Sequence, residues 1–424
     1  MEFDTSTIVL TMKSKLIAPR NKLLTTNLSR RVFVEKSLTY YAALLSMPVI
    51  SSCSEVGGHS KIVSNLTSLG PLQSADQYGC RLPAGFKCRI IARSSSPVTP
   101  DSNFNWHGAP DGGACFADGV GWIYVSNSEL SAGNGGVSAI NFDSSGTIVD
   151  AYSILSNTSR NCAGGSTPYG TWLSCEETGE SGRVFECDPT GTAEAIERPA
   201  LGYFNHEAVA YDTDKHTLYL TEDRPDGKLY RFTAANLTTN GYADLSAGQL
   251  EVAEIVKSGL TDTMVWHHIA DPLAIALPTR YQVTESSPFN GGEGIVYING
   301  LLAFTTKGDN KVWQYNTLSG SIEVIYDDDT SSNPILTHVD NITANFAGEY
   351  LVAEDGGDMQ LIILTKSGEV KPLLSLEGQE LSEITGPAFS PDGSRLYLSS
   401  QRGVTGHSAD GITYEITGPF FSEV

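Results

Sequence analysis

The sequence predicts an all-β chain made of a repeated unit of short strands. Glycine and proline account for 42 and 19 of the 424 residues, a density that favours many short strands joined by turns. From about Gly108 onward, segments of alternating apolar and polar residues recur, and the last three units repeat at about 46 to 48 residues. This period is typical of β-propeller blades, which cannot bury both faces alone. The chain is therefore expected to form a six-bladed β-propeller with an inserted loop or helical segment.

Six units follow one another, each with three or four short strands and turn residues between them. The first covers residues 114–127 and continues at Gly136, and the second contains Cys175 and residues 182–187. The other four begin, in order, at Glu207, Glu293, Asn341 and Gly386. We interpret residues 53–424 as a single propeller domain, in which the innermost strands line a channel and bring distant residues together.

An insertion at about residues 234–290 interrupts the repeat. Its part around residues 264–276 has some helical character in the sequence pattern. We expect it to lie outside the blades as a cap or long loop, a place where functional segments often occur.

The first 52 residues are predicted to be an export signal and not part of the fold. Residues 29–36 contain Arg30-Arg31 and resemble a twin-arginine signal, and the apolar run 38–50 follows. That run is too short to remain in a bilayer as a spanning helix. Residues 50–53 match a lipobox, so Cys53 is a candidate for lipidation; the alternative is ordinary cleavage that leaves Cys53 lost or free. We expect an exported protein, either periplasmic or anchored to a membrane as a lipoprotein.

The charge balance excludes some partners. A formal net charge of −22 argues against nucleic acid and anionic membrane surfaces as binding partners. Most of the excess carboxylate is expected on the solvated surface, but carboxylates are also the ligands that calcium requires.

Six cysteines follow Cys53. Because no C-x-x-C pair is present, a zinc ribbon is excluded. Cys80 and Cys88 could close a local disulfide in an oxidising compartment, and free thiols are the alternative.

Residues 161–178 form the most unusual segment of the chain. A polar, glycine-rich turn is followed by a short strand-like stretch that ends in Cys175, Glu176 and Glu177. Since successive strand residues point to opposite faces, Cys175 and Glu177 should share one face and Glu176 the other. A thiol beside two carboxylates suggests a bound cation; the alternative is an exposed Glu pair after a buried, inert cysteine.

Carboxylates also occur at corresponding places in the other units. The set comprises Glu129, Glu176, Glu177, Glu207, Glu293 and Asp340, the last followed by Asn341. Acids that converge on one axis repel one another unless cations offset their charge. A single acid of this kind is more often a solvated turn residue, but several at the blade starts favour a metal cluster. Oxygen ligands suit calcium, whereas a thiolate selects a transition metal.

Residues 161–177, Asn-Cys-Ala-Gly-Gly-Ser-Thr-Pro-Tyr-Gly-Thr-Trp-Leu-Ser-Cys-Glu-Glu, resemble the signature of the PhoX-type alkaline phosphatases, exported metal-dependent phosphoesterases. Residues 386–401 are similar to the last blade of that family. The resemblance implies a calcium- and iron-containing cluster in the channel of a six-bladed propeller, with a cysteine sulfur that bridges the irons. Carried over by motif, Cys175 is that thiolate. The predicted metal ligands are Glu129, Cys175, Glu176, Glu207, Glu293, Asp340 and Asn341.

Two departures from the family pattern affect the expected substrate site. Ser128 stands where the family usually has His, and Gly291 stands where an Arg that holds phosphate is expected. Arg224 and Arg402 are candidates to replace that Arg, because a guanidinium pairs with phosphate through two hydrogen bonds. The alternative for each is an ordinary surface ion pair. The predicted catalytic residues are therefore Cys175, Arg224 and Arg402.

The leading functional prediction is a monomeric, exported phosphoesterase that uses calcium and iron to hydrolyse small phosphate esters. One alternative is a calcium-dependent propeller hydrolase of the lactonase type, which needs no thiolate. The other is a non-catalytic propeller whose acids bind structural calcium. The fold alone does not separate these three.

Overall fold

A computed structural model describes residues 62–259 and 261–423. The predicted signal at residues 1–52 and the candidate lipidation site Cys53 lie outside these residues. The described part of the chain is almost wholly β-structure, and its only helices are six single 3₁₀ turns. These turns are η1 (Leu66–Ser68), η2 (Gly179–Ser181), η3 (Pro199–Leu201), η4 (Thr279–Tyr281), η5 (Lys307–Asp309) and η6 (Ser408–Asp410). None has the length and apolarity that a membrane-crossing helix requires.

Two neighbouring sheets in the first half of the propeller have four antiparallel strands each. The first contains β4 (Pro110–Asp118), β5 (Gly121–Ser128), β6 (Gly135–Phe142) and β7 (Ile148–Thr158). The second contains β8 (Asn161–Ser166), β9 (Trp172–Glu176), β10 (Val184–Cys187) and β11 (Ile196–Glu197).

The largest sheet has nine strands and covers two repeats. Its first repeat contains β12 (His206–Asp212), β13 (Thr217–Glu222), β14 (Leu229–Ala234) and β15 (Gly248–Ser258). Its second contains β17 (Gly292–Ile298), β18 (Leu301–Thr306), β19 (Lys311–Asn316) and β20 (Ser321–Asp327). The strand β16 (Thr261–His268) pairs with β15 along its whole length and with β20 through Asp262 and Thr263, which joins the two repeats.

The remaining large sheets contain strands from both ends of the described chain. The five-stranded sheet has the order β2 (Cys80–Arg81), β24 (Val370–Leu376), β23 (Gln360–Leu364), β22 (Tyr350–Glu354) and β21 (Val339–Ala344). The next has the order β25 (Ile384–Phe389), β26 (Arg395–Ser400), β27 (Ile412–Thr417) and β3 (Lys87–Arg93). A two-stranded sheet pairs β1 (Ile62–Ser64) with β28 (Phe421–Glu423). Because β3 is the outer strand beside β27, an early segment of the chain completes the sheet built by the last one.

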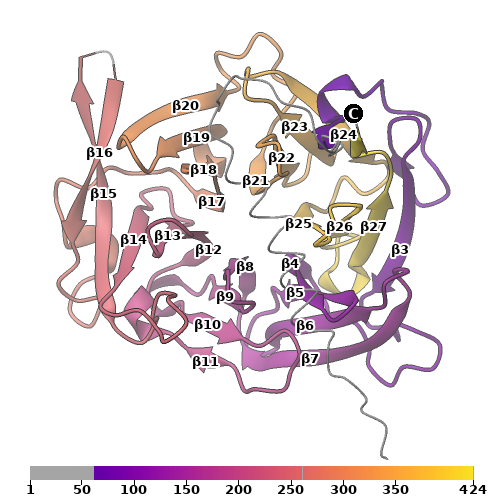
Figure 1. The fold of residues 1–424 in the computed structure, drawn as a ribbon, viewed down its shortest axis with the longest axis horizontal. Helices are drawn as coiled ribbons and strands as arrows, with labels where there is room; N and C mark the ends of the chain where they lie inside the picture. The colour runs from indigo at the N-terminus through magenta and orange to yellow at the C-terminus, as the bar shows by residue number, and fades with distance from the viewer. Residues whose placement is uncertain (1–61, 260, 424) are drawn as a thin grey trace, which may run out of the picture. The chain divides into compact units, whose positions relative to one another are not determined.

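The sheets surround a central axis, as Figure 1 shows, with β4, β8, β12, β17, β21 and β25 nearest to it. The apolar core lies between neighbouring sheets: one buried cluster joins Leu173 and Val184 to Val209 and Leu220, and the other clusters bridge adjacent sheets in the same way. This arrangement explains the repeat, because each sheet needs a neighbour on both sides to cover its apolar faces.

The all-β, propeller-like fold predicted from the sequence is confirmed. The expectation of six separate four-stranded blades is met only in part, because β16 merges two repeats into one sheet and β2 adds a fifth strand to another. The helical character expected at residues 264–276 is wrong: residues up to His268 belong to β16, and turns follow. Pairing with β15 outweighs a weak local helical preference.

Candidate metal centre

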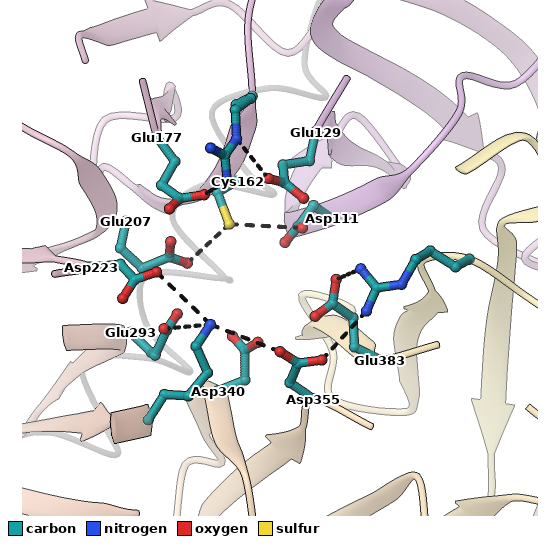
Figure 2. A pocket seen from close by; sticks show the side chains of 13 residues that line it. Asp111, Glu129, Cys162, Glu177, Glu207, Asp223, Glu293, Asp340, Asp355 and Glu383 are labelled. Atoms are coloured by element: carbon teal, nitrogen blue, oxygen red, sulfur yellow. Dashed lines mark hydrogen bonds and ion pairs between the residues drawn. The ribbon is translucent and has the colours of Figure 1, made fainter. Parts of the chain in front are cut away.

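The strands nearest the axis share a β-bulge at one position. In five of them the pairing with the next strand shifts by one residue near the start of the strand. A β-bulge places two residues of one strand opposite a single residue of the partner strand and changes the direction of the first side chain. The first bulge residues are Asp111, Cys162, Glu207, Glu293 and Asp340. These five side chains point toward one another from five repeats, as Figure 2 shows.

A second group of side chains comes from the ends of the adjoining strands. Each repeat contributes one such residue, which directly follows the last residue of the second strand that pairs with the first strand. The set comprises Glu129, Glu177, Asp223, Lys307, Asp355 and Gln401. The first five line the same cavity, and Gln401 Nε2 donates to Asp111 Oδ2 at 2.6 Å and to Glu129 Oε2 at 3.0 Å.

The cavity formed by these two groups has a volume of about 170 Å³. Its walls carry nine carboxylates, one thiol and only three basic side chains, Arg160, Lys307 and Arg402. Lys307 Nζ lies 2.7 Å from Glu293 Oε1 and 3.9 Å from both Asp223 and Asp355. The cavity is therefore strongly anionic even with its three basic groups charged.

The two guanidinium groups each bridge a pair of acids on the cavity wall. Arg160 contacts Glu129 at 3.2 Å and Glu177 at 2.5 Å. Arg402 contacts Glu383 at 2.8 Å and Asp355 at 3.4 Å.

Hydrogen bonds from one repeat to the next hold the bulges in place. Thr221 donates to the carbonyl of Glu293 at 2.5 Å, and Thr305 donates to that of Asp340 at 2.5 Å. Asn127 Nδ2 donates to the carbonyl of Cys162 at 3.0 Å. Each donor is the residue that the bulge of its own repeat leaves unpaired in the second strand, so three of the repeats position the cavity-facing segment of the next repeat.

Cys162 is the thiol of the cavity. Its Sγ lies 3.3 Å from Glu207 Oε1 and 3.8 Å from Asp111 Oδ2. Its sulfur also forms a group with carboxylate oxygens of Glu129 and Glu177 in which all ligand atoms lie within 4.8 Å of one another.

The structure does not place Cys175 at the cavity, which corrects the sequence prediction. Cys175 is fully buried in an apolar cluster with Leu173, Val209 and Leu220. It occupies the same strand position as Asn127 and turns toward the neighbouring sheet and not toward the axis. Strand alternation does not link it to Glu177, because β9 ends at Glu176.

The other predicted residues divide into two groups. Glu129, Glu207, Glu293, Asp340 and Arg402 line the cavity. Glu176, Asn341 and Arg224 are not among its lining residues. Glu176 accepts the backbone N–H of Ser159 at 2.9 Å, and Asn341 donates to Asp340 Oδ1 at 2.7 Å, so these two act as supports.

Sequence reasoning missed several lining residues. These are Asp111, Arg160, Cys162, Asp223, Lys307, Asp355 and Glu383. Two of these residues could have been found by aligning the repeat units at their strand starts. In that alignment Asp111 and Cys162 occupy the position of Glu207, Glu293 and Asp340 in the other units.

The raised pKa values of the lining acids indicate that the cavity favours bound cations. Burial, followed by the charge of nearby acids, raises the pKa of Asp111, Glu207 and Glu383 well above the ordinary value. Burial likewise raises the pKa of Asp340 and Glu177 to about 7. So many neighbouring, largely buried carboxylates cannot all ionise unless positive charge is added. Both the donor set and its charge fit bound metal ions.

Residues 124–182 and 178–312 match the family of alkaline phosphatase PhoX. No curated protein sequence matches the chain.

Of three solved structures that match the chain, only the first has a TM-score above 0.5. Pseudomonas fluorescens PhoX in complex with vanadate, a transition state analogue, shares 16% identity with a TM-score of 0.68 over 82% of this chain and 97% of that chain. A gluconolactonase from Xanthomonas campestris shares 12% identity with a TM-score of 0.45 over 83% and 98% of the two chains. A protein of unknown function from Bacteroides thetaiotaomicron shares 10% identity with a TM-score of 0.47 over 82% and 83%. The chain is therefore similar to the PhoX alkaline phosphatases in sequence over residues 124–312 and in fold over most of its length.

Proposed function

We propose that the chain is a metal-dependent phosphoesterase that hydrolyses small phosphate esters at the cavity on the propeller axis. The observation that carries this proposal is Cys162, a thiol among carboxylates at a bulge position that four other repeats fill with acids. A calcium-only hydrolase or a structural calcium site has no use for a soft ligand at that position.

The donor set supports a mixed iron and calcium site. Cys162 with Glu129 and Glu177 would hold iron, because a thiolate favours a transition metal. Two groups with oxygen donors alone suit calcium. They are Asp111 with Glu129 and Glu383, and Glu207 with Glu293 and Asp340.

Metal ions bound there would polarise a phosphate ester and activate an oxygen nucleophile. The protein itself has to hold the acids close together against their repulsion, and the bulges with their Thr and Asn donors do this. Arg402 is the proposed phosphate-binding residue, since its guanidinium faces the cavity and takes the role of the Arg absent at Gly291. Lys307 adds a positive charge among the acids in the same way that a bound cation would.

The finer architectural and cellular predictions are part of the same proposal. We count β12–β15 and β17–β20 as two blades, which makes six in all. We also propose that residues 1–52 direct export and that Cys53 is lipidated, with the mature chain monomeric. N-terminal sequencing and mass measurement of protein from an exporting host would test the cleavage and the lipid.

The test is metal analysis joined to three assays on the full chain purified from such a host. We expect iron and calcium, hydrolysis of p-nitrophenyl phosphate, inhibition by vanadate and no hydrolysis of gluconolactone. Calcium without iron, together with lactone hydrolysis, would support the lactonase alternative. Calcium without either activity would support a structural propeller.

A further inference from the structure

A second cluster of thiols lies far from the cavity, where the early part of the chain crosses from one sheet to the next. Cys80 is in β2 and pairs with Leu376 of the five-stranded sheet. Cys88 is in β3 and pairs with Ile416 of the neighbouring sheet. The two cysteines are therefore attached to different sheets, although only seven residues separate them in sequence.

The side chains of the two cysteines meet across this boundary. Their sulfur atoms and a carboxylate oxygen of Asp76 all lie within 4.8 Å of one another. Cys80 is 2% exposed, whereas Cys88 is partly exposed. To form a bond, the two sulfurs have to move from within 4.8 Å to about 2 Å of one another.

The alternative for such a cluster is a metal site, and the contacts of Asp76 argue against it. Asp76 Oδ1 accepts the backbone N–H of Tyr78 at 2.8 Å and that of Cys80 at 3.0 Å, so this oxygen serves the turn. The cluster also offers three ligands, fewer than the four of a structural zinc site.

We propose that Cys80 and Cys88 form a disulfide when the protein meets an oxidising disulfide compound. The bond would fasten β2 and β3 together at the place where an early strand completes the sheet of β25–β27. It would close a short loop whose Phe86 packs edge-on against Phe420 at 4.9 Å, so the loop is already held in shape by the core.

The chemistry is thiol–disulfide exchange. The partly exposed Cys88 attacks as a thiolate on one sulfur of oxidised glutathione, which forms a mixed disulfide and releases one glutathione thiolate. Cys80 then gives its proton to solvent and attacks the Cys88 sulfur, which expels the second glutathione. Two protein thiols are oxidised and one glutathione disulfide is reduced, so electrons and atoms balance.

The experiment uses the purified full chain, incubated with oxidised glutathione or with dithiothreitol, alkylated in denaturant and digested with trypsin. Cleavage after Lys61, Arg81, Lys87 and Arg89 places the two cysteines in separate peptides, residues 62–81 and 88–89. We expect these peptides to be linked after oxidation and separate after reduction. The oxidised protein should also melt about 2–5 °C higher than the reduced protein.

Two variants and a metal measurement complete the test. Cys88→Ser should abolish the linked peptide and the melting shift, whereas the control Cys187→Ser, at a buried cysteine in another sheet, should retain both. Two alkylated peptides in the oxidised wild type would overturn the proposal. So would a zinc ion bound by the wild type and lost from Cys88→Ser.

Discussion

Replacement of Cys162 by Ser is the most informative test of the proposed metal centre. The sulfur lies among four carboxylates, with Glu207 at 3.3 Å and Asp111 at 3.8 Å, so a hydroxyl in its place removes the one soft ligand of the cavity. Loss of an outer support of a metal ligand alone costs 10–100-fold in affinity or activity, on the order of 1.4–2.7 kcal/mol. Loss of the ligand itself should cost at least about 100-fold in kcat and remove most of the iron.

The matched control is Cys175→Ser, the same substitution in the same segment. Cys175 is fully buried in an apolar cluster, where an unpartnered hydroxyl would cost about 1–3 kcal/mol. The equivalent residues in two other repeats, Thr221 and Thr305, carry hydroxyls that donate to a backbone carbonyl of the next repeat. A Ser hydroxyl at position 175 has the same opportunity, so we expect a cost of about 1 kcal/mol or less and full activity per folded molecule.

The two variants are compared by metal content, by turnover of p-nitrophenyl phosphate and by thermal melting. Calcium should largely persist in Cys162→Ser, because the oxygen donors of the cavity remain. If Cys175→Ser loses iron and turnover while Cys162→Ser keeps both, the assignment of the thiolate to the bulge in β8 is wrong.

Three further predictions concern the support and charge of the cavity. Arg402→Lys should raise the KM for a phosphate monoester about 10-fold or more, because paired hydrogen bonding to phosphate is lost, while Arg231→Lys at a distant ion pair should not. Thr221→Val removes the hydrogen bond to the neighbouring bulge. We expect it to lower the free energy of unfolding by about 1–2 kcal/mol in urea titrations and to reduce turnover as well. Unchanged stability would contradict the supporting role of Thr221. Metal removal should make stability depend on pH, since Asp340 and Glu177 have folded-state pKa values of about 7, above the ordinary 3.8 and 4.5. Because the folded state holds these two protons more tightly than the unfolded state, proton binding contributes its full stabilisation below about pH 4. This stabilisation is lost as pH rises through 7, so chelated protein should melt lower at pH 8 than at pH 5.5. Restored metal should remove most of that difference, and a chelated protein with equal melting temperatures at both pH values would count against the buried acids as its cause.

The sequence by itself determined the all-β repeat architecture. Strand periodicity and turn residues are local properties, and they persist along the chain whatever the neighbouring sheets do. The repeat also indicated that Glu129, Glu207, Glu293 and Asp340 would meet, because equivalent positions in a closed ring of sheets face one axis.

Only the tertiary structure decided which cysteine faces that axis. Both Cys162 and Cys175 lie in one short segment, and the resemblance to the PhoX-type signature assigned the thiolate to the one beside the two glutamates. The bulge in β8 aims Cys162 at the axis, while the residue it leaves unpaired, Cys175, points into the neighbouring sheet. A bulge depends on the pairing register between strands and on the donor from the preceding sheet, here Asn127, and neither is a property of the segment alone.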